Sequence, residues 1–589
     1  MTRRTGSARA ATLAGCAVAF AAASGAAEAI GPALLLDPEP AWAPARLLLA
    51  LAVAVGGAGA GAVAAGIVAV AGRHHVLASE PQPIDLSRGT VVATAALALV
   101  LGAAVRFAGL ERLPFPLWLD EVLLVPDTLA LHGGPSDFRD SVRTVRDDGG
   151  RPAGTVGVLY LEAFRAALRT FGTGVFGVRF LSAAGGVLSL ATAMLLGRAL
   201  LPRGGAMLAG LTLAGLRWSL ILSRWGWNMI LLAPLIDVAT LAAIRSRRRG
   251  SIVAALAAGL LAGLATHVYL SAWIAAPALA GFLLWPGGSG ARRLLRAGVF
   301  AGALAIAALP LWLMKEGRQT PYLVRASRHN VVVEMRHAKS VMPLLRAARK
   351  ALLAPWLADP NPLNDLPGRA RLPILPGLAL SVSFAAAILR PRQDLHALML
   401  TNAGAGFLAS LAWGERLSPN GARFAYLTTL VSVAVASGLL RLIGSVPGRL
   451  RRAAALAAVG ALLVSGAISA GDLQRWDRDR GMYVAIVGQH TSVAWASLRW
   501  EPYGEVRLED SPLYAPPTID VIRRFRIVPR REAERPPPAG RRERCFRIAP
   551  PGTRPRPAER VVERVRDAWG EDWAVVLGGR SGPGCPSGP

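Results

Sequence analysis

Apolar runs of about 20 residues recur along most of this sequence, and short arginine clusters separate many of them. A run of this length crosses the hydrocarbon core of a bilayer as a helix, because a helix satisfies all of its own backbone polar groups. The pattern therefore predicts an all-α polytopic membrane protein with about thirteen transmembrane helices. The candidate spans lie near residues 11–35, 46–72, 90–109, 176–200, 204–222, 227–244, 251–270, 271–285, 297–314, 373–390, 396–413, 424–443 and 452–470.

Composition agrees with a membrane protein and argues against a nucleic-acid-binding protein. Hydrophobic residues make up 53% of the 589 residues and charged residues only 17%, so lipid must cover part of the surface. The formal net charge is +29. Because the arginines fall in loops between apolar runs and not along one soluble domain, loop charge explains the excess. We expect no nucleic-acid partner.

The arginine clusters also predict the orientation. Short cytoplasmic loops carry an excess of Lys and Arg, and a cytoplasmic amino terminus places every short cluster inside. We expect a multi-pass protein of the cell membrane (a bacterial inner or plasma membrane) with an extracytoplasmic carboxyl terminus. The clusters lie at 73–75, 245–249, 292–293, 390–392 and 449–452.

This topology divides the chain into three parts. Residues 1–85 hold two additional amino-terminal helices, although 11–35 could also be read as a cleavable signal peptide. Residues 86–470 form the membrane core, with long outer loops at 110–175 and 315–372. Residues 471–589 form an extracytoplasmic tail. Long polar insertions in a compact bundle are usually functional, so we expect the function at the outer face.

The tail itself gives weaker signals. Residues 481–500 and 515–528 are apolar enough to pack on the bundle, whereas the Pro- and Arg-rich stretch 530–560 predicts a poorly ordered linker. Residues 559–578 are expected to form a small helix and a strand. Cys545 and Cys585 lie on the same, oxidising side, so the sequence leaves open whether they form a disulfide.

Two adjacent carboxylates follow the 90–109 span. Asp120 and Glu121 lie among apolar residues where a helix leaves the lipid, and such acids are costly to keep ionised and usually functional. The alternative is that they favour the dipole of a helix starting at 121. That alternative explains one acid well and both acids poorly.

From this point the sequence resembles a known family, the membrane glycosyltransferases of family 39 with the GT-C fold. These include the protein O-mannosyltransferases and the lipid A aminoarabinose transferase. Five stretches between about 90 and 430 match the family's motifs in order. They are Leu119-Asp120-Glu121; Gly154 to Phe164 with Leu159-Tyr160; Phe176 to Ala183 with Gly186-Val187-Leu188 and Leu196-Gly197-Arg198; Leu222 to Asn228 with Ile230-Leu231-Leu232; and Asp359-Pro360-Asn361-Pro362 with Asn364 and Leu366-Pro367-Gly368.

The resemblance implies transfer of a sugar from a polyprenyl-phosphate carrier to an acceptor hydroxyl at the outer membrane surface. A hydroxyl is a weak nucleophile, so a carboxylate must take its proton, and we expect Asp120 to be this base. The apolar surroundings would raise its basicity by desolvation. Glu121 could orient the acceptor or share the proton.

The departing lipid phosphate requires cations at the outer surface. Candidates for donor-phosphate binding lie at or near that surface, and we favour Arg224 and Arg328 among them. For Arg179 and Arg325 the alternative is that the side chains extend to lipid headgroups. The full set of candidates is Arg179, Arg224, Arg325, Arg328 and His329.

One motif departs from the family pattern. The family's histidine before the Leu159-Tyr160 motif is absent, and Arg151, preceded by Asp147 and Asp148, stands near its place. We assign Asp147, Asp148, Arg151 and Tyr160 to acceptor binding or loop positioning. The carboxylates at 120, 147 and 148 could also bind a divalent metal, but solvated loop charge is the commoner explanation. We expect no cofactor and no metal.

Two other functions remain as alternatives. A transporter or flippase for lipid-linked glycans predicts acids near the bilayer midplane and an internal repeat, and Asp237 is the clearest charge inside a span. A non-catalytic membrane scaffold presenting the tail is the other alternative. The expected partners are a polyprenyl-phosphate sugar donor, membrane lipids and an unidentified acceptor (protein, lipid or polysaccharide). The sequence does not specify the sugar or the carrier length.

Overall fold

The computed structural model describes much of the chain from residue 80 onward. The chain forms two compact units. Among the described residues, the first unit comprises those within 80–106, 184–223 and 228–472, and the second those within 107–183, 224–227 and 473–580. The predicted spans 11–35 and 46–72 lie outside the described residues. The described residues are 80–112, 117, 119–131, 142–146, 152–287, 289–313, 330–354, 356, 366, 370–417, 421–477, 488–503, 505–509, 516–525, 527, 543–557, 559–566 and 572–580.

Helices lie at each of the eleven remaining predicted spans. Seven are long and apolar enough to cross a membrane, and α8 with α9 makes an eighth if that bent pair is one span. The prediction of an all-α polytopic membrane protein is confirmed, while the number of thirteen spans stays a prediction. The helices are α3 (Arg88–Phe107), α7 (Val175–Leu200), α8 (Gly205–Ala214), α9 (Arg217–Arg224), α10 (Leu232–Arg249) after the 3-10 turn η2 (Asn228–Leu231), α11 (Ile252–Thr266), α12 (Ala272–Leu284), α13 (Gly290–Leu313), α17 (Ile374–Leu389), α18 (Asp394–Leu417), α19 (Leu427–Ser445) and α20 (Gly448–Asp477).

Three details modify the predicted bundle. The span predicted at 204–222 is broken, because α8 ends at the C-cap Gly215 and α9 continues at an angle of 58°. In its described residues, the outer loop predicted at 315–372 contains two helices, α15 (Val331–Ala338) and α16 (Met342–Leu353). A 3-10 turn, η4 (Gly421–Phe424), precedes α19.

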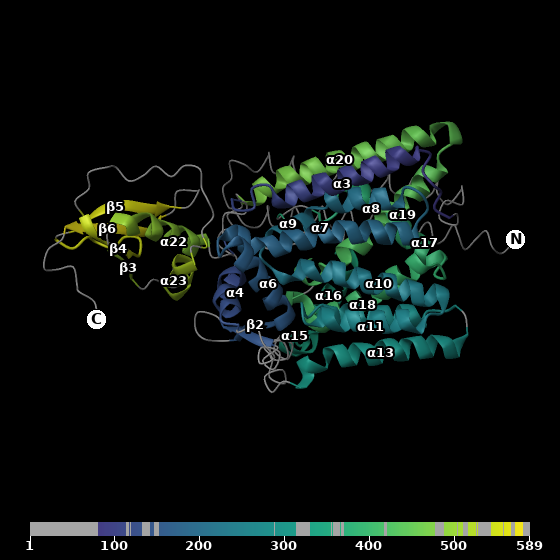
Figure 1. The fold of residues 1–589 in the computed structure, drawn as a ribbon, viewed down its shortest axis with the longest axis horizontal. Helices are drawn as coiled ribbons and strands as arrows, with labels where there is room; N and C mark the ends of the chain where they lie inside the picture. The colour runs from purple at the N-terminus through teal and green to yellow at the C-terminus, as the bar shows by residue number, and fades with distance from the viewer. Residues whose placement is uncertain are drawn as a thin grey trace. The chain divides into compact units, whose positions relative to one another are not determined.

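Small residues allow the helices of the first unit to pack closely. Figure 1 shows α10, α11 and α13 side by side, and α11 contacts both neighbours. Gly259 and Gly263 of α11 face α13. A Cβ added at Gly259 would lie 2.3 Å from the Phe300 carbonyl oxygen, and one added at Gly263 would lie 2.5 Å from the Ala307 Cβ. Glycines four residues apart are typical of membrane helix interfaces, where van der Waals contact replaces the hydrophobic effect.

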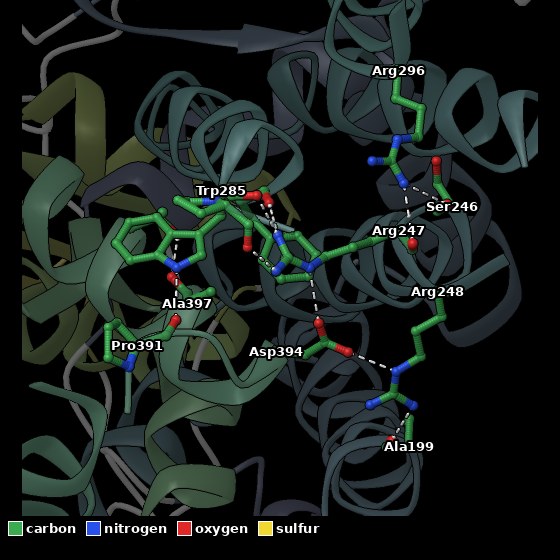
Figure 2. A network of polar contacts seen from close by, with 12 residues as sticks. Ala199, Ser246, Arg247, Arg248, Trp285, Arg296, Pro391, Asp394 and Ala397 are labelled. Atoms are coloured by element: carbon green, nitrogen blue, oxygen red, sulfur yellow. Dashed lines mark hydrogen bonds and ion pairs between the residues drawn. The ribbon is translucent and has the colours of Figure 1, made fainter. Parts of the chain in front are cut away.

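Arginines satisfy helix ends at one edge of the first unit, as Figure 2 shows. Asp394, at the start of α18, accepts from Arg247 Nε at 3.0 Å and from Arg248 Nε at 2.6 Å. Arg247 also donates to the Phe282 and Trp285 carbonyls at the end of α12, and Arg248 donates to the Ala199 carbonyl near the end of α7. The last carbonyls of a helix lack intrahelical partners, so these guanidinium groups supply the missing donors.

Arg296 of α13 completes this cluster. Its Nη1 donates to the carbonyls of Ser246 and Arg247 in the last turn of α10, at 3.2 and 3.1 Å. The loop arginines that predicted the orientation are therefore also structural, and they connect the ends of α7, α10, α12, α13 and α18.

Asp237 connects three helices in the interior of the first unit. The carboxylate on α10 accepts from the Thr192 hydroxyl of α7 at 2.5 Å and from the Thr429 hydroxyl of α19 at 2.6 Å. All three side chains are buried. Each threonine hydroxyl also has a nearby carbonyl on its own helix, at Ser189 and Tyr426 respectively, which it can bond instead.

The cost of losing Thr192 should therefore depend on Asp237. We expect Thr192→Val to lower the free energy of unfolding by about 1–3 kcal/mol, because it removes a donor from a buried carboxylate oxygen. In an Asp237→Leu background the same change should cost close to nothing. Thermal unfolding of the four purified proteins measures both effects, and equal costs in the two backgrounds would refute the coupling.

The second unit combines a helical part and a sheet. Within it, α4 (Leu119–Leu129) packs on α6 (Val158–Phe171), and the antiparallel hairpin of β1 (Val142–Arg146) and β2 (Pro152–Gly157) lies between them in sequence. Within its described residues, the tail adds two helices, a 3-10 turn and a four-stranded sheet of order β3-β4-β6-β5, in which the β3–β4 pair is parallel and the other pairs are antiparallel. These elements are α22 (Gly488–Trp500), η5 (Glu501–Tyr503), β3 (Glu505–Leu508), α23 (Pro516–Phe525), β4 (Glu543–Ala549), β5 (Glu559–Arg566) and β6 (Asp572–Arg580).

Two predictions for the tail were wrong. Residues 559–578, predicted as a helix and a strand, form the antiparallel strands β5 and β6. Strand β4 lies inside the stretch 530–560 that was predicted as a linker, and Phe546 and Ile548 of this strand are buried. Cys545 on β4 is disulfide-bonded.

A salt-bridge network joins Arg547 of β4 to the first residue of β5, on the far side of β6, and to Glu509 just after β3. Arg547 Nε donates to Glu559 Oε1 at 2.9 Å, its Nη2 contacts Glu559 Oε2, and its Nη1 donates to Glu509 at 2.7 Å. The hydrogen bond from Arg547 is the main cause that holds the pKa of Glu559 below its ordinary value.

This lowered pKa predicts acid sensitivity of the sheet. A carboxylate with a lower pKa in the folded state stabilises at neutral pH, and the contribution is lost as the pH falls from the unfolded value of about 4.3 through the folded value. The protection factors for amide hydrogen exchange in residues 543–580 of the full-length protein, from which the intrinsic pH dependence of exchange is divided out, should fall below about pH 4.3. We expect Glu559→Gln to exchange faster at neutral pH and to show a smaller acid response. An unchanged acid response in this variant would refute the assignment.

Candidate active site

The two adjacent acids begin helix α4 in the second unit. The backbone of Asp120 lies in the first turn of α4, and its side chain lies outside the described part of the chain. Glu121 follows it, and its side chain has no exposed surface. The contacts described below are therefore those of the Glu121 carboxylate.

Arg179, from the first turns of α7, binds Glu121 with two hydrogen bonds. Arg179 Nε donates to Glu121 Oε1 at 2.9 Å and its Nη2 donates to Oε2 at 3.3 Å. Its Nη1 donates to the Leu110 carbonyl at 3.3 Å, and the guanidinium lies 5.8 Å from the centre of the Trp225 ring. Both charged side chains are fully buried, so Arg179 does not extend to lipid headgroups.

The turn between α9 and α10 supplies a third partner for Glu121. The backbone N–H of Gly226 donates to Glu121 Oε1 at 2.6 Å. This approach requires glycine, because an added Cβ would lie 2.8 Å from the Val178 carbonyl oxygen and 3.1 Å from the Glu121 Cγ. The Ser182 hydroxyl donates to the Trp227 carbonyl at 2.7 Å and fixes the other end of the turn.

Arg224 begins this turn within the same unit. Its side chain is buried, and its Nη2 donates to the Gly109 carbonyl at 2.9 Å. The second unit thus brings together three predicted site residues, Glu121, Arg179 and Arg224. Two of them, Glu121 and Arg179, bind each other.

Residues of the tail contact the segments around the two acids. The sequence did not predict which residues make these contacts. Thr491 of α22 accepts from the Leu117 backbone N–H at 3.3 Å, just before the acids. Trp476 meets Trp225 edge-on, with ring centres 5.1 Å apart. The Thr173 hydroxyl, close to the start of α7, donates to the Phe525 carbonyl at the end of α23 at 2.9 Å.

The other predicted residues are less closely defined. Tyr160 is buried in α6 and stacks on Phe164, with ring centres 5.8 Å apart. Asp147, Asp148 and Arg151, between β1 and β2, lie outside the described residues, as do Arg325, Arg328 and His329. Among the residues that are described, no group of three His, Cys, Asp or Glu side chains could hold a metal ion.

Sequence reasoning missed Gly226, Thr491 and a buried arginine in the first unit. Arg106 of α3 donates to the Ser219 and Ser223 hydroxyls and to the carbonyls of Gly102 and Leu213. An arginine inside an apolar run was a visible signal for this residue. Gly226 stands between two tryptophans in a family-like motif, but nothing local indicates that its N–H bonds an acid 105 residues away.

Fold and site together define a polytopic α-helical membrane protein with a buried acid–arginine pair beside the acid motif. No protein-family model and no curated protein matches the chain. Among solved structures, it is similar to ArnT from Cupriavidus metallidurans in the apo state, with a TM-score of 0.49 and 14% identity over 83% of this chain and 98% of that one.

Two further structures are similar at comparable levels. ArnT from Cupriavidus metallidurans bound to undecaprenyl phosphate matches with a TM-score of 0.43 and 15% identity, over 84% of this chain and 98% of that one. The oligosaccharyltransferase AglB from Archaeoglobus fulgidus, in complex with an inhibitory peptide and a dolichol-phosphate, matches at 0.44 and 14%, over 74% and 64%. At these identities the likeness assigns no activity to this chain.

Breaking the Glu121–Arg179 pair should destabilise the protein strongly. Arg179→Met leaves an uncompensated buried carboxylate, which typically costs about 3–5 kcal/mol. Glu121→Gln keeps an acceptor for Gly226 but turns an amide donor toward Arg179. We expect both single variants to lower the thermal unfolding midpoint, and the double variant to cost less than the sum of the two. Additive losses would contradict a direct interaction.

Proposed function

We propose that this protein is a membrane glycosyltransferase that moves a sugar from a polyprenyl-phosphate-linked donor to an acceptor hydroxyl at the outer face of the membrane. The proposal rests on the five family-like motifs and on one structural observation. Glu121 is fully buried and held by Arg179 and Gly226. Its immediate neighbour in the same helical turn is Asp120.

The burial of Glu121 separates the roles of the two acids. A carboxylate that already binds a guanidinium and a backbone N–H is suited to positioning and not to proton transfer. Three bonds to Glu121 fix the backbone at the start of α4, and therefore the backbone of Asp120. Preorganisation of this kind is what a general base requires, since small displacements of a catalytic group are costly. We assign the base to Asp120 and positioning to Glu121 and Arg179.

The proposed reaction proceeds in one displacement. Asp120 takes the proton of the acceptor hydroxyl while the acceptor oxygen bonds to the anomeric carbon of the sugar. The bond between that carbon and the phosphate oxygen breaks, and the lipid phosphate leaves as an anion. Cations stabilise this developing charge. We propose Arg224 from the described residues and keep Arg325, Arg328 and His329 as sequence-based candidates.

Two observations support an outer location. The arginine cluster in Figure 2 lies where the positive-inside rule places cytoplasmic loops. Cys545 in the tail is disulfide-bonded, and such bonds persist on the oxidising side of the cell membrane. A screen of labelled donors identifies the sugar, and the labelled product identifies the class of acceptor.

Asp120→Asn tests the catalytic assignment. Wild-type protein in membrane vesicles is incubated with labelled polyprenyl-phosphate hexoses and pentoses, and both a new glycosidic bond and label moved across the vesicle are measured. We expect Asp120→Asn to lose transfer by about 10²- to 10⁴-fold, as removal of a general base does, with unchanged thermal unfolding.

Asp520→Asn is the matched control. Asp520 lies on α23 in the same unit with its side chain 66% exposed, so the same chemical change there should leave transfer intact. Full activity of Asp120→Asn would remove this residue as the base. Movement of label without a glycosidic bond in the wild type would instead identify a transporter.

A further inference from the structure

Helices α15 and α16 in the first unit carry an apolar surface that the described fold leaves exposed. Val341, Leu345 and Leu352 are 62%, 55% and 63% exposed, and Met342 and Val332 are also exposed. A cluster of large apolar side chains on a surface element marks a contact site with a partner or with lipid.

The exposed residues share one face of α16. Met342, Leu345, Arg349 and Leu352 are spaced by three or four residues, which places them along one side of the helix. Ala347 on the opposite side is fully buried. The buried side accounts for packing against α18, whereas the exposed side has an apolar stripe that this packing does not use.

Basic residues accompany the apolar stripe. The segment 331–353 has five Lys or Arg residues and one acid, Glu334. Arg346 and Arg349 are exposed on α16, and Lys339 occupies the left-handed turn between the helices at φ 47°. An apolar stripe bordered by cations is the pattern of helices that lie in the headgroup layer of a bilayer.

The surroundings of α16 place it at a membrane. Helix α18, on which it packs, is a candidate membrane span. Trp356 follows α16 and donates from its indole nitrogen to the Gly377 carbonyl near the start of α17 at 3.2 Å. Tryptophans concentrate at the membrane–water interface, where the ring is in lipid and the N–H finds an acceptor.

We propose that α15 and α16 form a lipid-binding surface whose occupant is the anionic phospholipid of the surrounding bilayer. Leu345, Leu352 and Met342 enter the acyl boundary, and Arg346 and Arg349 bind lipid phosphates. The aliphatic part of each arginine covers apolar surface while the guanidinium reaches the headgroup. This inference does not depend on the proposed sugar transfer.

Fluorescent labels at single cysteines test the immersion of α16. In a Cys16→Ser background, with Cys545 left in its disulfide, Leu345→Cys and Leu352→Cys are labelled in the full-length protein after reconstitution into bilayers of phosphatidylcholine and phosphatidylglycerol. We expect quenching by lipids with a nitroxide on the acyl chain and little quenching by aqueous iodide. The Cys16→Ser protein without an introduced cysteine, carried through the same labelling, supplies the blank.

Two controls set the scale of the quenching. Ile306 on the candidate span α13 is 68% exposed, so a label at Ile306→Cys should respond as a lipid-facing site. Val561 on β5 is 42% exposed, so a label at Val561→Cys should be quenched by iodide. Iodide quenching at Leu345 would refute the proposal in favour of a water-facing surface. Protection from both quenchers would refute it in favour of cover by protein.

Charge selection is tested on the same labelled protein. Nitroxide-bearing phosphatidylglycerol should quench the label at Leu345 more than nitroxide-bearing phosphatidylcholine. Each of Arg346→Gln and Arg349→Gln should lower this preference, by up to about fivefold per charge at low salt. An equal response to both lipids in the starting protein would refute the anionic preference.

Discussion

The contact between Glu121 and Arg179 is the interaction on which the acid region depends. Removing two charges from water is costly, and the cost is recovered only where hydrogen bonds satisfy both groups. Here the carboxylate has partners on Arg179 and Gly226, and the guanidinium has a further partner on Leu110. Three chain segments that are distant in sequence are therefore fixed to one another: the start of α4, the start of α7 and the turn at 224–227.

The first unit follows a different constraint, which is that the hydrocarbon core of a bilayer offers no hydrogen-bond partners. Several of its helix ends and interior polar groups are satisfied within the protein, although the buried hydroxyls of Ser383 and Ser437 have no hydrogen-bond partner. Arg247, Arg248 and Arg296 supply donors to carbonyls at the ends of helices. Asp237 accepts from two threonines on two other helices. This arrangement suits a fixed link between helices.

The predictable part of the fold is the part that hydrocarbon determines. Hydrophobic run length gave the positions of the helices, because length and composition decide whether a helix can cross lipid. The tail was predicted poorly, because Glu559 to Arg566 consists largely of charged residues and valines without a clear period. Its strand conformation is decided by pairing with β6, and pairing partners are not visible in a single sequence.

The candidate site shows the same division. The acids at 120 and 121 stood out from the sequence, since charge is rare beside apolar spans. The division of roles that we propose for them did not, because the partner of Glu121 is 58 residues away and the second donor is a backbone N–H. Arg179 was predicted to bind a phosphate or a headgroup, and only the three-dimensional structure shows that its guanidinium is engaged by Glu121.

The bond between Leu117 and Thr491 has a consequence for the order of assembly. These residues are 374 positions apart, and almost all of the membrane bundle is synthesised between them. Domains fold as synthesis proceeds, so the segment before the acids emerges long before its partner exists. The region around α4 is therefore completed last, when α22 has been synthesised, and a chain that stops before residue 488 would insert its helices without completing the region around the two acids.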